Sequence, residues 1–241
     1  MHPFNKAIVL TAAIALTPPV LGQSLDEGVD AYRNGDYATT LENFEPLAEQ
    51  GDASAQYNLG VMYANGEGVP QNASTAVEWY RKAAEQGDAD AQYNLGVMYD
   101  NGDGVPQNDG KAAQWYRRAA EQEHASAQNN LGLMYANGEG VPQNASTSAE
   151  WYRKAAEQGH ADAQFKLSAS YYLDEGVSHN PVMAYVLANL AAAQGHEKGR
   201  ELRDLFADEL SRDQIAEGQR MASEWRVGTP LPYFKDFSTW P

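Results

Sequence analysis

A block of 36 residues recurs three times almost unchanged and a fourth time in altered form. From Asp52 it reads DASAQYNLGVMYANGEGVPQNASTAVEWYRKAAEQG, and the next copies start at Asp88, His124 and His160. Self-similarity at a period of about 20 to 50 residues is typical of solenoids, in which one unit cannot bury its apolar face alone and stacks on its neighbours. The repeat therefore predicts an elongated array with a continuous core.

Two helices are predicted in each copy. In the first copy, helix A runs roughly from Ala53 to Ala64 and ends at an Asn-Gly-Glu-Gly turn, where glycine accepts the positive backbone dihedral of a helix C-terminus. Helix B starts after Asn72, an N-cap residue, and ends at Gly87. Gly60 allows another helix to approach helix A closely. The predicted fold is all-α, an α-solenoid of stacked antiparallel helix pairs.

The flanking segments carry helical patterns without the full repeat. The predicted organisation is a signal peptide at 1–22, an N-terminal capping helix pair at 23–51, four repeats at 52–195, C-terminal capping helices at 196–225 and an irregular tail at 226–241. Terminal units of a solenoid are expected to be atypical, because one side of each faces water. The proline-rich tail has no periodicity, and it either folds back along a groove or is mobile.

The first residues have the order of a secretory signal. Lys6 precedes an apolar run from Ala7 to Leu16, and Pro18 and Pro19 break the helix before the small residue Gly22. The run is too short to span a bilayer of about 30 Å as a helix. We therefore expect an exported protein, periplasmic or secreted, with no membrane span after the signal is removed.

Composition excludes several functional classes. Lys and Arg number 17 against 33 Asp and Glu, a net charge of -16, which opposes binding to nucleic acid phosphates or to an anionic membrane surface. The chain has no cysteine. This excludes disulfides, thiolate catalysis and cysteine-ligated metal.

The repeat resembles the Sel-one-like repeat (SLR) family, whose helical hairpins are related to the tetratricopeptide repeat (TPR). The resemblance covers roughly residues 50 to 195. The residues that carry it in the first copy, each with equivalents 36 and 72 positions later, are Ala55, Leu59, Gly60, Tyr63, Gly66, Gly68, Val69, Ala76, Trp79, Tyr80, Lys82, Ala83, Ala84 and Gly87.

The resemblance implies a right-handed superhelix whose concave side binds other proteins or, in some bacterial members, cell-envelope components. Some secreted bacterial members carry a disulfide in each repeat and have been called β-lactamase-like or penicillin-binding. This chain has no cysteine and therefore departs from that subgroup. In the fourth copy Leu187 and Ala188 replace the Trp-Tyr pair of the other copies, which indicates a transition to the C-terminal cap.

Catalytic motifs are absent from the sequence, and we predict no enzyme activity, cofactor or metal site. There is no Ser-x-x-Lys, G-x-S-x-G, H-E-x-x-H, Walker or G-x-G-x-x-G motif. His124, His160 and His196 invite a metal interpretation, but they share one repeat position on helices about 8 to 10 Å apart, whereas ligands must converge on one ion at about 2 Å. We interpret them as turn or cap residues.

The aromatic pairs of helix B admit two interpretations. Trp79-Tyr80, Trp115-Tyr116 and Trp151-Tyr152 form either a ladder for carbohydrate stacking or the packing between repeats. Packing is favoured, because alanines flank every pair and large rings bury much area. Loss of a buried Trp115 would then cost about 3 to 5 kcal/mol of stability.

The candidate binding residues lie on helix A, away from the face of Ala55, Leu59 and Tyr63. At about 100° per residue they form an inner strip of amides and aromatics suited to an extended peptide. Packing of one repeat on the next is the alternative role for the Tyr57 and Val61 positions. The strip residues are Tyr57, Asn58, Val61, Tyr93, Asn94, Val97, Asn129, Asn130, Leu133, Phe165 and Lys166.

Three functional hypotheses follow from these features. The first is a non-enzymatic, exported scaffold or adaptor whose concave face binds a protein or peptide partner, to regulate or assemble a cell-envelope complex. The second is a binder of cell-wall glycan or glycopeptide that uses the same aromatic and amide side chains. The third, carried by family resemblance alone, is a β-lactamase-like hydrolase.

Overall fold

The computed structural model describes residues 24–232, so the predicted signal segment 1–22 and the end of the tail, 233–241, lie outside the described residues. The helices are α1 Leu25–Arg33, α2 Tyr37–Glu49, α3 Ala53–Asn65, α4 Ala73–Glu85, α5 Ala89–Asn101, α6 Asp109–Glu121, α7 Ala125–Asn137, α8 Ala145–Glu157, α9 Ala161–Leu173, α10 Pro181–Ala193, α11 Glu197–Glu209 and α12 Arg212–Glu224. Residues 24–232 contain no β-strand.

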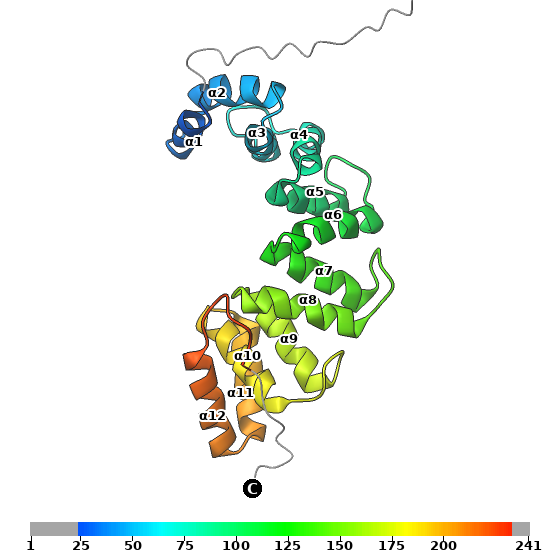
Figure 1. The fold of residues 1–241 in the computed structure, drawn as a ribbon, viewed down its shortest axis with the longest axis vertical. Helices are drawn as coiled ribbons and strands as arrows, with labels where there is room; N and C mark the ends of the chain where they lie inside the picture. The colour runs from blue at the N-terminus through cyan, green and yellow to red at the C-terminus, as the bar shows by residue number, and fades with distance from the viewer. Residues whose placement is uncertain (1–23, 233–241) are drawn as a thin grey trace, which may run out of the picture.

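Consecutive helices pack against each other from α1 to α11, and α12 packs on α10, which confirms the predicted all-α solenoid. Figure 1 shows the helices stacked in chain order along an arc, with α1 and α12 on the same side of the central repeats. Helices α3, α5, α7 and α9 are the A helices of the four repeats, and α4, α6, α8 and α10 are the B helices. The buried apolar side chains run through successive repeats as adjoining clusters.

Helix boundaries follow the local sequence signals. The Asn72 side chain accepts a hydrogen bond from the backbone N–H of Thr75 and so caps α4, as predicted. Helix α3 ends at Gly66, whose φ of 77° is the left-handed conformation that favours glycine. In the fourth repeat Asn180 caps α10 and Pro181 is its first residue.

The helices of each pair approach closely because a ring of one lies on a glycine of the other. A Cβ atom on Gly60 would lie 2.5 Å from the ring of Tyr80, closer than van der Waals contact permits. The same contact joins Gly28 to Phe44, Gly96 to Tyr116 and Gly132 to Tyr152. Because Tyr80 is only 4 % exposed, its ring fills the space between α3 and α4. Glycine is therefore needed for packing at these helical positions.

Replacing Gly96 by alanine should destabilise the protein by about 1 to 3 kcal/mol, the usual cost of forcing an extra carbon into a packed core. The new Cβ atom would lie 2.6 Å from the ring of Tyr116. Gly110→Ala is the matched control, since a Cβ there meets nothing closer than 3.5 Å. Urea denaturation should show Gly110→Ala neutral or slightly more stable, because alanine favours helix. Equal effects of both substitutions would contradict the packing role.

A buried glutamine connects each repeat to the preceding one. Gln92 on α5 is 4 % exposed, and its Nε2 donates to the carbonyl oxygen of Ala84 in the last turn of α4 at 3.0 Å. Its Oε1 accepts from Nε2 of Gln122 at the end of α6 at 2.8 Å. Gln92 thereby gives a second donor to a carbonyl near the helix C-terminus, which also accepts from the Gly87 N–H at 3.1 Å. The arrangement recurs at Gln56–Gln86, Gln128–Gln158 and Gln164–Gln194.

Gln92→Leu should lower the free energy of unfolding by about 0.5 to 1.5 kcal/mol for each hydrogen bond lost, because the Ala84 carbonyl keeps only the Gly87 N–H as donor and the Gln122 amide loses its partner on α5. Gln114→Leu is the control, since Gln114 lies on the exposed face of α6. Chemical denaturation measures both. A loss no greater for Gln92→Leu than for Gln114→Leu would show that the hydrogen bonds across the repeat junction add nothing to stability.

The loops also fix the spacing of the repeats. Gly104, in the loop after α5, lies so close to the first turn of α4 that a Cβ on it would be 2.4 Å from the carbonyl carbon of Ala73. Ser74 Oγ donates to the Gly104 carbonyl oxygen at 3.2 Å. Gly140 and Gly176 make the same approach to the preceding B helices. Each loop therefore rests on the repeat before it.

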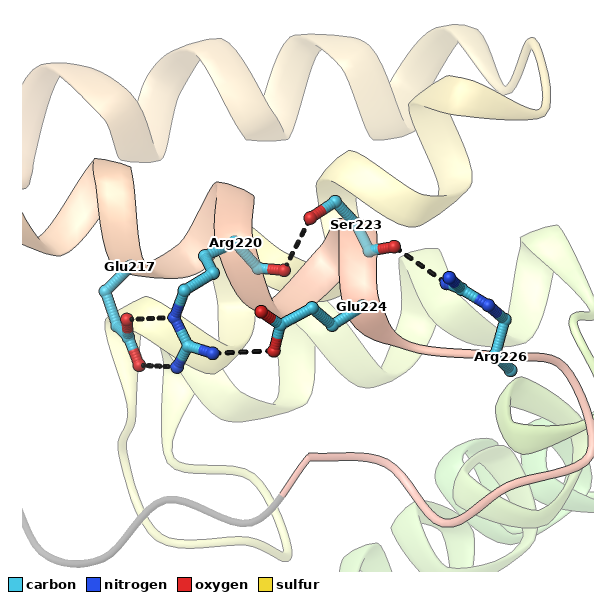
Figure 2. A network of polar contacts seen from close by, with 5 residues as sticks. All are labelled: Glu217, Arg220, Ser223, Glu224 and Arg226. Atoms are coloured by element: carbon cyan, nitrogen blue, oxygen red, sulfur yellow. Dashed lines mark hydrogen bonds and ion pairs between the residues drawn. The ribbon is translucent and has the colours of Figure 1, made fainter.

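Helix α12 carries a cluster of charged side chains in its last turns. Figure 2 shows Arg220 on α12 bound to both carboxylate oxygens of Glu217, at 2.8 and 2.6 Å, and to Glu224 at 2.6 Å. Arg226 donates to the Ser223 carbonyl oxygen at 2.7 Å and so satisfies a free carbonyl at the end of the helix. The chain turns away from α12 after this point.

The described part of the tail folds back on α8. The Gly228 N–H donates to the Glu157 carbonyl oxygen at 2.7 Å, and the Leu231 N–H donates to the Glu157 carboxylate at 3.1 Å. Leu231 is 6 % exposed and packs in the cluster of α8, α10 and α12. Residues 226–232 therefore fold back on the array, as in the first of the two outcomes given for the tail.

Candidate binding surface on the A helices

The predicted strip lies on α3, α5, α7 and α9, and we call its eleven residues the helix-A strip. All are half-buried except Asn129, which is buried. Each repeat contributes a ring position and an amide position, and the first three repeats also contribute an aliphatic position. The ring position holds Tyr57, Tyr93, Asn129 and Phe165, the amide position Asn58, Asn94, Asn130 and Lys166, and the aliphatic position Val61, Val97 and Leu133.

The strip tyrosines take part in packing within each repeat as well as lying at the surface. The ring centroid of Tyr57 is 6.0 Å from that of Tyr80 on α4, and Tyr93 is 5.9 Å from Tyr116 on α6. Burial raises the pKa of Tyr57, Asp90 and Asp88 adding to the rise. These contacts lie within one repeat, so they differ from the predicted alternative of packing one repeat on the next, and the half-buried rings keep an accessible outer part.

The histidines at the shared repeat position are helix N-caps, as predicted. Nδ1 of His124 accepts from the Ala127 N–H at 3.2 Å, which leaves the ring hydrogen on Nε2. Nε2 lies 3.2 Å from Asp90 Oδ1, and the ring stacks on Tyr93 at 4.6 Å between centroids. His196 repeats both contacts, with Asp162 at 2.8 Å and with Phe165 at 4.8 Å. His124 and His196 thus hold Tyr93 and Phe165 in place.

His160 lacks the partners of the other two histidines. It caps α9 through Nδ1, at 3.4 Å from the Ala163 N–H. The residues in the partner positions are Ser126, which replaces the aspartate, and Asn129, which replaces the ring. Within residues 24–232, neither an ion pair nor a stacked ring is present at His160.

An open depression lies at the C-terminal half of the strip. Its volume is about 580 Å³, and it is lined by Asn129, Asn130, Leu133, Asp162, Phe165, Lys166, His196, Glu197 and Lys198. Three successive A-type helices, α7, α9 and α11, supply these residues. The structure therefore brings together five predicted strip residues, whereas Tyr57, Asn58, Val61, Tyr93, Asn94 and Val97 lie along the array outside the depression.

Charged side chains of both signs line the depression: Asp162 and Glu197, and Lys166 and Lys198. His196 pairs with Asp162, but Lys166 and Lys198 form no ion pair with the described residues. Amides, rings and ammonium groups together can bind backbone groups and side chains of a peptide.

The Trp-Tyr pairs divide between core and surface. Tyr80, Tyr116 and Tyr152 are 1 to 4 % exposed, as the packing interpretation requires. The tryptophans are only half-buried, and a cation lies over each indole: Lys82 on Trp79 at 3.8 Å, Arg118 on Trp115 at 4.4 Å and Lys154 on Trp151 at 4.1 Å. The cost of about 3 to 5 kcal/mol for a fully buried ring therefore does not apply to Trp115.

The geometry does not assemble a catalytic centre from these groups. Nδ1 of each cap histidine is already bound to a backbone N–H, so that nitrogen is unable to act as a base. Among the described residues, no group of three or more His, Cys, Asp and Glu side chains could hold a metal ion.

Sequence reasoning missed two features of this surface. Lys198 belongs to α11, which was assigned only to the cap, so its position beside Lys166 was not foreseen. The replacement of a tyrosine by Asn129 is visible when the repeats are aligned, and this difference between copies was the available signal for the depression. Asn129 was predicted as one more amide of the strip.

The stability of the protein should depend on pH through His160. Burial lowers the pKa of His160, with His124 acting in the same direction and Asp162 against it. Because the pKa of His160 is lower in the folded state, its contribution to stability is complete above the unfolded pKa of about 6.5. This contribution is lost as the pH falls through the folded pKa.

His160→Asp keeps an N-cap, as Asp88 does in the second repeat, and should reduce this pH dependence. The measurement is the urea midpoint at pH 7.5 and pH 5.5 for both chains. We expect wild type to lose more stability than His160→Asp over this interval, and the same loss in both would assign the pH dependence to other groups.

Comparisons with known proteins agree with the architecture. The Sel1 repeat family model matches residues 53–88, 89–124, 125–160 and 161–196. A Sel1 repeat protein from Oxalobacter formigenes is 32 % identical, with 83 % of this chain and 84 % of that chain covered and a TM-score of 0.72. A search among curated proteins gives no match.

Two other solved structures are similar at lower TM-score. A protective antigen of uropathogenic Escherichia coli strains that displays an SLR fold is 32 % identical, with 83 % of this chain and 52 % of that chain covered and a TM-score of 0.46. An immunity protein from Pseudomonas aeruginosa is 17 % identical, with 85 % of each chain covered and a TM-score of 0.47.

Proposed function

The chain belongs to the Sel1 repeat family of helical scaffolds, and we propose that it is a non-enzymatic adaptor whose helix-A strip binds an extended segment of a partner protein. The observation that carries the proposal is the surface itself. Half-buried rings and amides repeat along successive A helices and lead into an open depression of about 580 Å³.

This surface has the chemistry that a peptide requires. A side-chain amide carries an oxygen and an NH₂ group, so Asn58, Asn94 and Asn130 can bind a peptide backbone with the hydrogen-bonding capacity that remains after Asn58 donates to the Ser54 carbonyl and Asn130 accepts from Asn129. Aromatic residues are the usual anchors of protein interfaces, since they bury large area with little loss of side-chain entropy. The rings are held by contacts to α4, α6 and the cap histidines, so a partner meets a preorganised surface.

Export to the cell envelope is part of the proposal. It is supported by the signal-like order of residues 1–22 and by the absence of cysteine, which makes the fold independent of redox compartment. No helix among residues 24–232 is both long and apolar enough to cross a membrane. The adaptor would act on an envelope complex from the periplasmic or outer side.

A glycan ligand is less well supported by the rings observed. Sugar stacking needs an open ring face, whereas a cation lies over each of Trp79, Trp115 and Trp151. Two strip rings, Tyr93 and Phe165, have a face covered by a histidine. Peptide binding can use ring edges and amides together, and we therefore propose a protein partner.

The test is a crosslinking pull-down from an envelope extract of the source cell. It compares wild type with the triple variant Tyr57→Ala, Tyr93→Ala and Asn130→Ala. The matched control is Glu78→Ala, Gln114→Ala and Glu150→Ala, one exposed position repeated on α4, α6 and α8. Far-ultraviolet circular dichroism should first show that both variants keep their helical content.

We expect at least one protein to be captured by wild type and by the control, and to be reduced at least tenfold in the strip variant. Equal capture by all three chains would move the site off the helix-A strip. Capture of envelope glycan without protein by wild type would replace the proposed partner class.

A further inference from the structure

The ring position of the strip is interrupted at one repeat. Tyr57, Tyr93 and Phe165 place a ring there in the first, second and fourth repeats, but the third has Asn129. An asparagine side chain is much shorter than a tyrosine, and Asn129 is only 6 % exposed, at the floor of the depression. The depression therefore lies where the regular ladder of rings would have continued.

Among residues 24–232, two groups at this point lack a partner: the side-chain oxygen of Asn129 and the ring of His160. The Asn129 Nδ2 donates to Asn130 Oδ1 at 3.2 Å, whereas Asn129 Oδ1 is buried without a hydrogen-bond partner. A buried acceptor without a partner is unfavourable, and a ligand with a suitable donor would remove that cost. His160, next along the array, has no ring stacked on it, unlike His124 and His196.

The walls of the depression are suited to a ring. Leu133 occupies the aliphatic position where the first and second repeats have valine, and Phe165 forms a wall with its ring stacked on His196. Lys166 and Lys198 also line the depression with no ion pair to the described residues, and the Lys166 ammonium lies 6.0 Å from the centroid of the Tyr152 ring. A flat apolar group therefore meets leucine, phenylalanine and ammonium groups.

We propose that this depression is the anchor pocket of the strip and takes one aromatic side chain with a hydrogen-bond donor, tryptophan or tyrosine, from a partner peptide. The ring replaces the one missing from the third repeat, and its indole N–H or phenol O–H donates to Asn129 Oδ1, which a small shift of the side chain exposes while Nδ2 keeps its hydrogen bond to Asn130. Rings favour contact with a lysine ammonium group, so the peptide ring meets Lys166 or Lys198. This inference rests on the proposed function and identifies the residue type by which the partner is recognised.

The occupant is argued from what the chain itself places at equivalent positions. In the second repeat the corresponding ring contacts both Tyr116 and His124, at 5.9 and 4.6 Å between centroids. A phenylalanine would fill the same space but leave Asn129 Oδ1 without a donor. The pocket is therefore expected to prefer tryptophan and tyrosine over phenylalanine.

The experiment titrates the full isotope-labelled chain with three small probes and follows backbone and side-chain amide signals by NMR. The probes are N-acetyl-tryptophanamide, N-acetyl-tyrosinamide and N-acetyl-phenylalaninamide. We expect shifts confined to Asn129, Leu133, Phe165 and their neighbours, with a dissociation constant of about 1 mM for the donor-bearing probes, as for other weak single-group ligands. The phenylalanine probe should bind several-fold more weakly.

Two reciprocal variants test the pocket. Asn129→Tyr supplies the ring that the first and second repeats carry, and should weaken probe binding at least tenfold. It should also raise the urea midpoint, because it removes the unpartnered acceptor and gives His160 a ring. Tyr93→Asn opens a gap one repeat earlier, and should add a second set of shifted signals near His124 without loss of the first.

Three results would overturn the proposal: unchanged probe binding by a folded Asn129→Tyr chain, shifts that do not involve Asn129, or equal binding of all three probes. Residues 233–241 contain Tyr233, Phe234, Phe237 and Trp240. If the probes shift Asn129 only in a chain ending at residue 231, the occupant is the chain's own segment, and the external peptide is excluded. Partner capture that depends on the strip, with no probe binding at Asn129, would leave the proposed function standing without this anchor.

Discussion

The contact between an aromatic ring of one helix and a glycine of its partner helix sets the distance between the two helices of a repeat. At Gly60 the ring of Tyr80 lies directly on the backbone of α3, so the two helices approach to the thickness of that ring. In the fourth repeat both partners change together, to Ser168 and Ala188. Tyr185 of α10 then lies on Gly218 of α12, at 2.8 Å from a Cβ placed there. The regular array ends where this contact is transferred to the C-terminal cap.

The glutamine contacts transmit that geometry from repeat to repeat. A purely apolar junction would allow neighbouring repeats to slide, because hydrophobic contact is not directional. Gln92 instead binds Ala84 of the previous repeat and Gln122 of its own, so it fixes both helices relative to α5. The strip side chains on the A helices are consequently spaced by polar contacts on the opposite, buried side of the same helices.

The sequence predicted the architecture well because the residues that begin and end its helices recur in each repeat. Asn72, Gly66 and the histidine caps act locally, through their own backbone neighbours, so pattern alone places them. Gln92 was missed because polar residues are expected at the surface, and its burial depends on two other helices. Sequence alone did not separate the roles of Trp115 and Tyr116, which are adjacent in the chain. In the structure Tyr116 lies in the core, whereas Trp115 is half-buried beneath the Arg118 side chain. The depression needed α11, which lies beyond the repeats.

In the proposed binding mode, the near-identical repeats would leave the position of a partner segment along the array undefined, and the third and fourth copies would define it. The first and second copies present the same Tyr, Asn and Val, so an extended segment could occupy either set of contacts with similar energy. A difference between copies breaks that equivalence, because only one position then matches a given side chain. Asn129 removes a ring and Lys166 replaces an amide by a charge, both at the depression. The regular repeats would therefore supply area, and the two irregular residues would determine where along the array a partner is fixed.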